Sequence, residues 1–168
     1  MTTATDNLVW RHHGEWWDSY ESREKKLFGT FKDNELEDLI TISQYLQAEG
    51  LRYVIESNRR RTWENCGSII WQLNEPWPNV ACTNLIEYYG TPKLAYYFVR
   101  DAYRNIAPSL KYVSLYYQAG QTFKADIYVL NDGSETTGKV ISILRDDSSR
   151  ALMYQEYSTT LNANTATY

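Results

Sequence analysis

Apolar residues recur at helical spacing in two stretches of the chain. The first follows Asn34, a favourable N-cap residue, and ends at the run Arg59–Arg61. Acidic residues lie in its first turn and arginines in its last turn, which is the distribution of charge that the helix dipole favours. The second has Thr91 as its N-cap and Pro92 at the first helical position, and Pro108 ends it. The apolar stripe predicted for this second helix consists of Leu94, Phe98, Ala102 and Ile106.

The run from Ser68 to Leu73 lies between these helices and is mostly apolar over the length of a strand. Such a run predicts a strand buried on both faces, as in parallel sheets flanked by helices, and the turn-like "TWENCG" precedes it. Residues 1–33 show no clean period, and "WRHHGEWWDSY" is typical of a surface loop packed by aromatic side chains. The order helix, buried strand, loop, helix up to about residue 107 indicates part of a β/α architecture.

Beyond Pro108 the pattern changes from helical spacing to alternation. Four strands are predicted, with turn signals between them at residues 119–120, 131–134 and 146–149. The strands are "LKYVSLYYQ", "QTFKADIYVLN", "GKVISILRDD" and "RALMYQEYSTT". The predicted fold class is therefore α/β plus all-β, with one domain over residues 1–107 and an antiparallel β domain over residues 108–168 that packs directly against it.

Composition and charge narrow the set of partners. A formal charge of −4 without a basic face argues against nucleic acid. We expect no membrane contact, because the chain has no secretion signal and no apolar run of spanning length, which slightly favours a cytoplasmic location. The two cysteines are too few for a disulfide framework or a zinc site, and the spacing of His12, His13 and Glu15 matches no metal site, so we expect neither a metal nor another cofactor.

The chain is rich in tyrosine and tryptophan, residues that offer an apolar face together with a polar edge. In "GSIIWQLNEPWP", residues 67–78, Trp71 and Trp77 flank Asn74 and Glu75. An indole can cover the apolar C–H face of a pyranose while polar groups bind its hydroxyls, so this stretch is a candidate sugar site. Sheet cores also use aromatic residues, and a buried, structural Trp71 is the alternative.

Two stretches carry a resemblance to a known family, namely "YLQAEGLRYVIESNRRR" and, after it, "WQLNEPWP" followed by "IEYYGTPKLAYYFVRDAYRNIAPSL". They resemble the end of the barrel in glycoside hydrolase family 2, and within that family the β-mannosidases most closely. The resemblance covers roughly residues 34–115. It implies the last part of a TIM (β/α)8 barrel followed by a partial immunoglobulin-like antiparallel β-sandwich.

The resemblance also implies a function, that of a retaining exo-β-glycosidase that hydrolyses terminal β-linked sugars. Trp71 would form part of the wall against which the bound sugar rests, and Asn74 and Glu75 could bind its hydroxyls. Trp77 would either border a neighbouring subsite or only pack the loop. Where β-mannosidases usually have Ser-Trp-Ser, this chain has Ala81-Cys82-Thr83, which leaves the sugar open between a β-mannoside and another β-glycoside.

Catalysis with retention needs two carboxyl groups about 5 to 5.5 Å apart. Glu75 is the one catalytic candidate, because an Asn-Glu pair carries the acid/base in related barrels. The resemblance places it instead in the eighth barrel strand, where the corresponding residue has a binding or structural role, and the family's Ser-Glu-aromatic-Gly nucleophile motif is absent. We therefore expect both catalytic glutamates to lie outside this chain and the isolated chain to be inactive.

Length agrees with a C-terminal piece of a larger enzyme, since a complete barrel takes about 250 residues. Both ends of the chain look cut, and unpaired barrel edges would favour a homo-oligomer. The alternative function is a non-catalytic carbohydrate-binding or structural β-sandwich module, suggested by the many tyrosines of residues 108–168.

Overall fold

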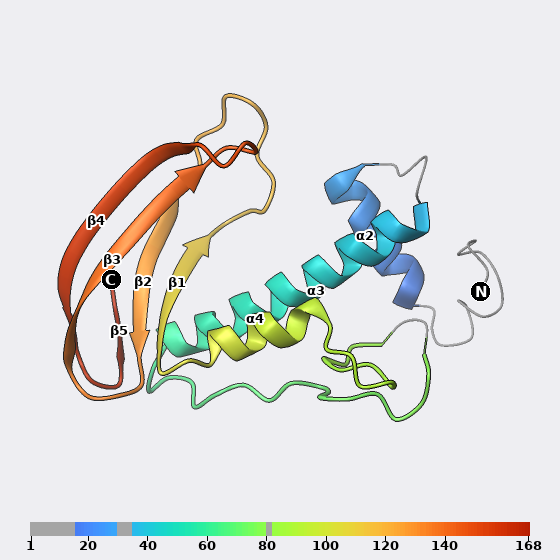
Figure 1. The fold of residues 1–168 in the computed structure, drawn as a ribbon, viewed down its shortest axis with the longest axis horizontal. Coiled ribbons are helices and arrows are strands. Elements are labelled where there is room, and N and C mark those ends of the chain that lie inside the picture. Colours follow the sequence, from blue (N-terminus) through green and yellow to red (C-terminus); the bar gives the residue numbers. More distant parts are fainter. Residues whose placement is uncertain (1–15, 30–34, 80–81) are drawn as a thin grey trace. The chain divides into compact units, whose positions relative to one another are not determined.

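The computed structural model describes residues 16–29, 35–79 and 82–168, and Figure 1 shows its helices and strands. Their bounds are α2 Trp16–Phe28, α3 Glu35–Arg60, α4 Leu94–Ala102, β1 Ile106–Tyr112, β2 Ala125–Asn131, β3 Thr136–Arg145, β4 Ala151–Leu161 and β5 Thr165–Thr167. The chain divides into two compact units. The first combines Met1–Ile55, Gly67–Tyr103 and Ser114–Phe123, and the second combines Glu56–Cys66, Arg104–Val113 and Lys124–Tyr168.

The long helix α3 confirms the first predicted helix, with Arg59 and Arg60 in its last turn. Its apolar face forms the core of the first unit together with α4. This core consists of Ala48, Ile55, Leu85, Ala95, Val99 and Ala102. Asn34, the predicted N-cap residue, lies outside the described residues. No helix among the described residues combines the length and the apolar character needed to cross a bilayer.

The predicted start and end of the second helix are wrong, and its predicted stripe is right only for Phe98 and Ala102. Helix α4 begins after Lys93, which makes no side-chain cap, because the preceding residues bond to a neighbouring loop: the Lys93 N–H donates to the Leu85 carbonyl at 2.9 Å. The helix ends at Ala102, and residues 106 and 107 already belong to β1. Its buried stripe is Ala95, Val99 and Ala102, whereas Leu94 is exposed.

Helix α2 occupies residues for which a loop was predicted. Glutamate, arginine and lysine are strong helix formers, and they fill most of residues 21–26, which carry no clear apolar period. Gly29 follows with a φ of 86°, and its N–H donates to the Lys25 carbonyl at 2.9 Å, as at many helix ends. The rejected metal candidates His12, His13 and Glu15 lie outside the described residues, and within those residues no three potential ligands gather.

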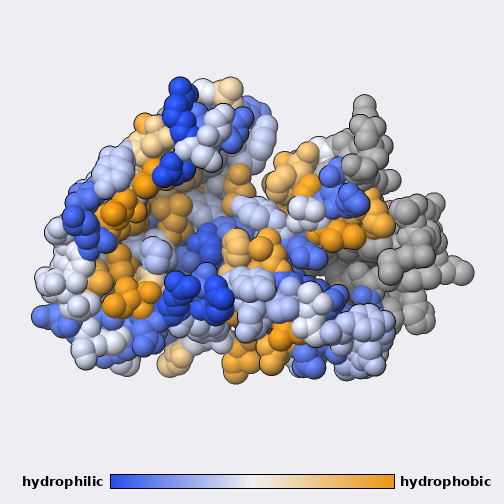
Figure 2. Space-filling view, in the orientation of Figure 1, coloured by the Kyte–Doolittle hydropathy of each residue, from blue (hydrophilic) through white to orange (hydrophobic). Residues whose placement is uncertain are grey.

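The second unit contains two antiparallel sheets, one in the order β1-β2-β5 and one made of β3 and β4. Alternation therefore predicted β strands correctly over most of this region. The first predicted strand is misplaced, because β1 ends at Tyr112 and passes through Pro108. Proline fits there because β1 is an edge strand, where a missing N–H costs no ladder bond. Apolar side chains also reach the surface over these strands (Figure 2).

A fully buried asparagine connects the strands of the second unit. The side-chain amide of Asn131 donates to the carbonyls of Ser134, Leu161 and Asn162 at 3.0, 3.2 and 3.0 Å. Its Oδ1 accepts the N–H of Gly133 at 2.9 Å. One side chain thus satisfies backbone groups at the end of β2, in the following turn and at the end of β4.

Candidate functional site

The segment of residues 67–75 does not form the predicted strand, and the two sheets in the described part of the chain are both antiparallel. A strand requires a continuous ladder of hydrogen bonds, and in the described structure this segment forms only isolated ones. Tyr103 donates its hydroxyl to the Ser68 carbonyl at 2.6 Å. The N–H groups of Leu85 and Ile86 donate to the Leu73 carbonyl at 3.1 and 2.9 Å. The segment is therefore fixed at both ends.

Burial along this segment alternates, whereas burial on both faces was predicted. Ile70 packs against the core of the first unit, while Ile69, Trp71 and Leu73 are exposed. The indole of Trp71 is 80% exposed, so it is not a buried core residue, and the peptide bond between Trp71 and Gln72 is cis. An indole in this position offers a free apolar face to a ligand.

The other three predicted site residues divide between the surface and the interior. Asn74 and Trp77 are exposed like Trp71. Glu75 is only 7% exposed, and its Oε2 accepts the N–H of Tyr88 at 3.1 Å. Its Oε1 has no hydrogen-bond partner among the described residues. The segment thus presents two indoles and an amide to solvent and holds the carboxylate against a neighbouring loop.

That loop, residues 82–88, is held in place by two polar side chains that sequence reasoning missed. Asn84 is completely buried and donates to the Ile86 carbonyl at 2.6 Å. Lys93 donates to the Asn84 Oδ1 at 2.7 Å and to the Cys82 carbonyl at 2.9 Å. Burial lowers the pKa of Lys93, although the neighbouring Cys82 and the carboxyl group of Glu75 act to raise it.

Helix α3 also contacts this loop. Gln47 donates its side-chain amide to the carbonyls of Thr83 and Asn84 at 2.7 and 3.2 Å. The loop in turn fixes the end of the Trp71 segment, since the Glu75 N–H donates to the Ile86 carbonyl at 3.1 Å. The sequence contains no signal for this arrangement, since Lys93 follows Thr91 and Pro92 as an ordinary polar residue at the start of the second predicted helix.

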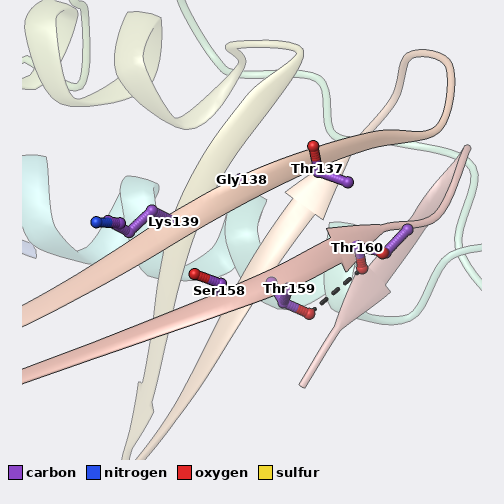
Figure 3. Close-up of a pocket in the computed structure, with 6 residues that line it drawn as sticks. All are labelled: Thr137, Gly138, Lys139, Ser158, Thr159 and Thr160. Carbon is purple, nitrogen blue, oxygen red and sulfur yellow. Dashed lines mark hydrogen bonds between the residues drawn. The ribbon is translucent and has the colours of Figure 1, made fainter.

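A second surface feature lies on β3 and β4. A shallow groove of about 450 Å³ is lined by Thr137, Gly138, Lys139, Ser158, Thr159 and Thr160 (Figure 3). These residues face each other across the ladder, Thr137 opposite Thr160 and Lys139 opposite Ser158. The lining offers hydroxyl groups and one ammonium group but no aromatic face.

Relatives of known activity resemble the chain in sequence. β-Mannosidase B of Aspergillus niger is 27% identical over 128 residues, which are 70% of this chain and 15% of the relative. β-Mannosidase B of Aspergillus terreus is 31% identical over 80 residues, which are 46% of this chain and 9% of the relative. No protein-family model matches the chain.

Solved structures of glycosidases also resemble the chain. The β-D-mannosidase of Dictyoglomus thermophilum is 27% identical with a TM-score of 0.60, and the match covers 82% of this chain and 16% of that one. The chain resembles the β-mannosidases of glycoside hydrolase family 2 in sequence and in fold. The exo-chitosanase CsxA of Amycolatopsis orientalis shares the fold with a TM-score of 0.66. It is 21% identical, and the match covers 88% of this chain and 17% of that one. The chain thus spans less than a fifth of each of these relatives.

Proposed function

We propose that the chain is part of a retaining exo-β-glycosidase of the β-mannosidase type, which hydrolyses terminal β-linked sugars. The observation that carries the proposal is the free indole of Trp71, 80% exposed on a segment that is hydrogen-bonded at both ends. The 27% identity to a solved β-D-mannosidase over 82% of the chain supports it. In this proposal residues 1–107 are the last part of a TIM barrel and residues 108–168 a partial immunoglobulin-like β-sandwich.

Each predicted site residue has a role in this proposal. Trp71 covers the apolar face of the sugar, and the exposed amide of Asn74 binds a hydroxyl. Trp77 borders a neighbouring subsite or packs its own loop. Glu75 contributes to the pocket through the loop of residues 82–88, whose Tyr88 N–H it accepts, and the catalytic glutamates come from outside this chain.

Sugar titration of the full chain tests the role of Trp71. We expect methyl β-mannoside to quench tryptophan fluorescence, and Trp71→Ala to weaken binding at least ten-fold, because a stacked ring is lost. Trp63→Ala is the matched control, since this tryptophan is 83% exposed but lies in the turn after α3. Equal binding by the Trp71→Ala variant and the unchanged chain would refute the assignment.

The alternative, a non-catalytic sugar-binding module, is favoured by the hydroxyl-lined groove on β3 and β4. Polar groups that converge from two paired strands could bind a sugar edge-on. The same titration distinguishes the two functions. Loss of binding in Thr137→Val and Thr160→Val, with binding intact in Trp71→Ala, would move the sugar site to the groove.

A further inference from the structure

Strand β4 differs from the other outer strands of the second unit, because little in it prevents pairing with another strand. Exposed edge strands usually carry proline or charged residues, or are very short. β1 contains Pro108 and Lys111, β5 has three residues, and β3 contains Lys139 and Arg145. β4 has 11 residues with one charged side chain, Glu156, and neither proline nor glycine.

The backbone of β4 is also unpaired on one side. Within the described residues β4 forms a ladder with β3 alone, in a sheet of two strands (Figure 1). In such a ladder alternate residues direct their N–H and C=O groups away from the partner. A two-stranded ribbon is marginally stable in water unless further strands extend it or a core covers it. The free edge of β4 therefore fits one kind of partner, another β strand.

The side chains of the ribbon favour the same partner, since apolar groups are exposed on both of its faces. Residues directly opposite in the ladder share a face. One face exposes the pair Ile143 and Tyr154, and the other exposes the pair Leu144 and Met153 together with Tyr157. Extension of the sheet would cover part of this apolar surface.

We propose that two copies of the chain associate through β4, which pairs antiparallel with β4 of the second copy. The result is a four-stranded sheet in the order β3-β4-β4-β3. Its two outer edges are then the β3 strands, which carry Lys139 and Arg145, so that growth stops at two copies.

Symmetry and charge restrict the register. When a two-fold axis relates two antiparallel strands of one sheet, the axis is perpendicular to the sheet. Residues on one face of the sheet then pair with residues on the same face. The residue that lies on the axis is opposite its own copy. Pairing over the whole strand, Ala151 to Leu161, would place Glu156 opposite Glu156, and like charges directly opposite are unfavourable. Two pairings of nine residues each avoid this. The one over residues 153–161, centred on Tyr157, would use Leu161, which is buried and whose carbonyl already accepts the Asn131 amide. The other, over residues 151–159, places Gln155 opposite Gln155.

In that register the remaining pairs are compatible. Met153 lies opposite Tyr157, where sulfur can contact an aromatic ring. Glu156, which forms an ion pair with Lys139 of its own chain at 2.7 Å, lies opposite Tyr154. Ser158 lies opposite Leu152 of the second copy. The two Ser158 residues are therefore six residues apart along the strand, or about 20 Å at roughly 3.3 Å per residue.

Cysteine crosslinking of the full chain tests both the partner and the register. Cys66 is exposed, so Cys66→Ser is introduced first to remove its thiol. Gln155→Cys should then form a covalent dimer of twice 19.7 kDa on mild oxidation, because opposite residues bring their thiols within disulfide range. Ser158→Cys on the same strand is the matched control and should stay uncrosslinked.

Light scattering and sedimentation of the unmodified chain complete the test. We expect a dimer whose dissociation constant rises about five-fold or more in Gln155→Glu, which places two carboxylates opposite each other. Thr136→Glu adds the same charge to an exposed position of β3, away from the apolar pairs of the ribbon, and should leave the dimer intact. A monomer at all concentrations would overturn the proposal, and so would crosslinking of Ser158→Cys as fast as that of Gln155→Cys.

Discussion

Trp71 and Glu75 are only four residues apart, yet their side chains have opposite environments. The large apolar indole is exposed, and the carboxylate, which is costly to bury without partners, lies inside against the Tyr88 N–H. Core formation alone would produce the reverse arrangement. The indole of Trp71 is therefore available to a ligand, and this is why Trp71 carries the functional proposal.

Lys93 is the residue whose removal should disturb this segment most specifically. Lys93→Met should lower the free energy of unfolding by about 1–3 kcal/mol, because the Cys82 carbonyl and Asn84 Oδ1 lose their donor. Urea unfolding at neutral pH measures this loss. Lys111→Met is the control, since Lys111 makes only an exposed ion pair and its loss should cost less than about 1 kcal/mol.

The pH dependence of that difference has a definite sign. Burial lowers the pKa of Lys93 in the folded chain below 10.5, so the unfolded chain keeps its proton to higher pH. The cost of burying the charge is present in full below the lowered pKa and disappears as the pH rises past 10.5. The unchanged chain should therefore gain stability relative to Lys93→Met as the pH approaches 10.5 from below. If the stability of the unchanged chain relative to Lys93→Met falls as the pH approaches 10.5, the lowered pKa of Lys93 is contradicted.

Among the elements of the second unit, the strand ends depend on Asn131. Asn131→Asp keeps the shape and the acceptor for Gly133 but places a carboxylate against three carbonyl oxygens. We expect a loss of about 3 kcal/mol or more in thermal or urea unfolding, because a buried charge loses its hydration without gaining donors. Asn162→Asp, at an exposed turn, should change stability by less than about 0.5 kcal/mol. Similar losses in both variants would argue against this role.

The elements also show how far the sequence alone can predict this fold. α3 was predictable because a long apolar period and end charges agree. The bounds of α4 were not, because Thr91 and Pro92 satisfy the local rules for a helix start, while backbone bonds to residues 85–87 hold them outside the helix. Period alone also could not reveal that residues 68–73 lack a continuous ladder, since the partners of a strand lie elsewhere in the chain.

The candidate site stays a prediction from its residue types, and the sequence could not predict the environments of those residues. The indole of Trp71 and the amide of Asn74 are exposed, as contact with a sugar would require. The burial of Glu75 and the contributions of Asn84 and Lys93 depend on a loop that approaches only in three dimensions. Spacing along the chain contains no information about such contacts.

At the scale of the whole molecule, the chain spans about 15% of the length of a related β-mannosidase, and its expected catalytic behaviour follows from the chemistry of retention. Two carboxyl groups about 5 to 5.5 Å apart are required, one as nucleophile and one as acid/base. Glu75 is the catalytic candidate, and at 7% exposure, with one oxygen bonded to Tyr88, it is poorly placed to reach a substrate.

We therefore expect the isolated 168-residue chain to release no 4-nitrophenol from 4-nitrophenyl β-mannoside above the uncatalysed rate, even where it binds methyl β-mannoside. A continuous absorbance assay at saturating substrate measures this. Glu75→Gln removes the candidate carboxylate. Glu64→Gln is its control, because Glu64 is exposed in the turn after α3. Hydrolysis that Glu75→Gln abolishes and Glu64→Gln leaves unchanged would make Glu75 catalytic. Binding without hydrolysis would instead support a chain that contributes the sugar-binding surface while the reacting carboxylates come from elsewhere.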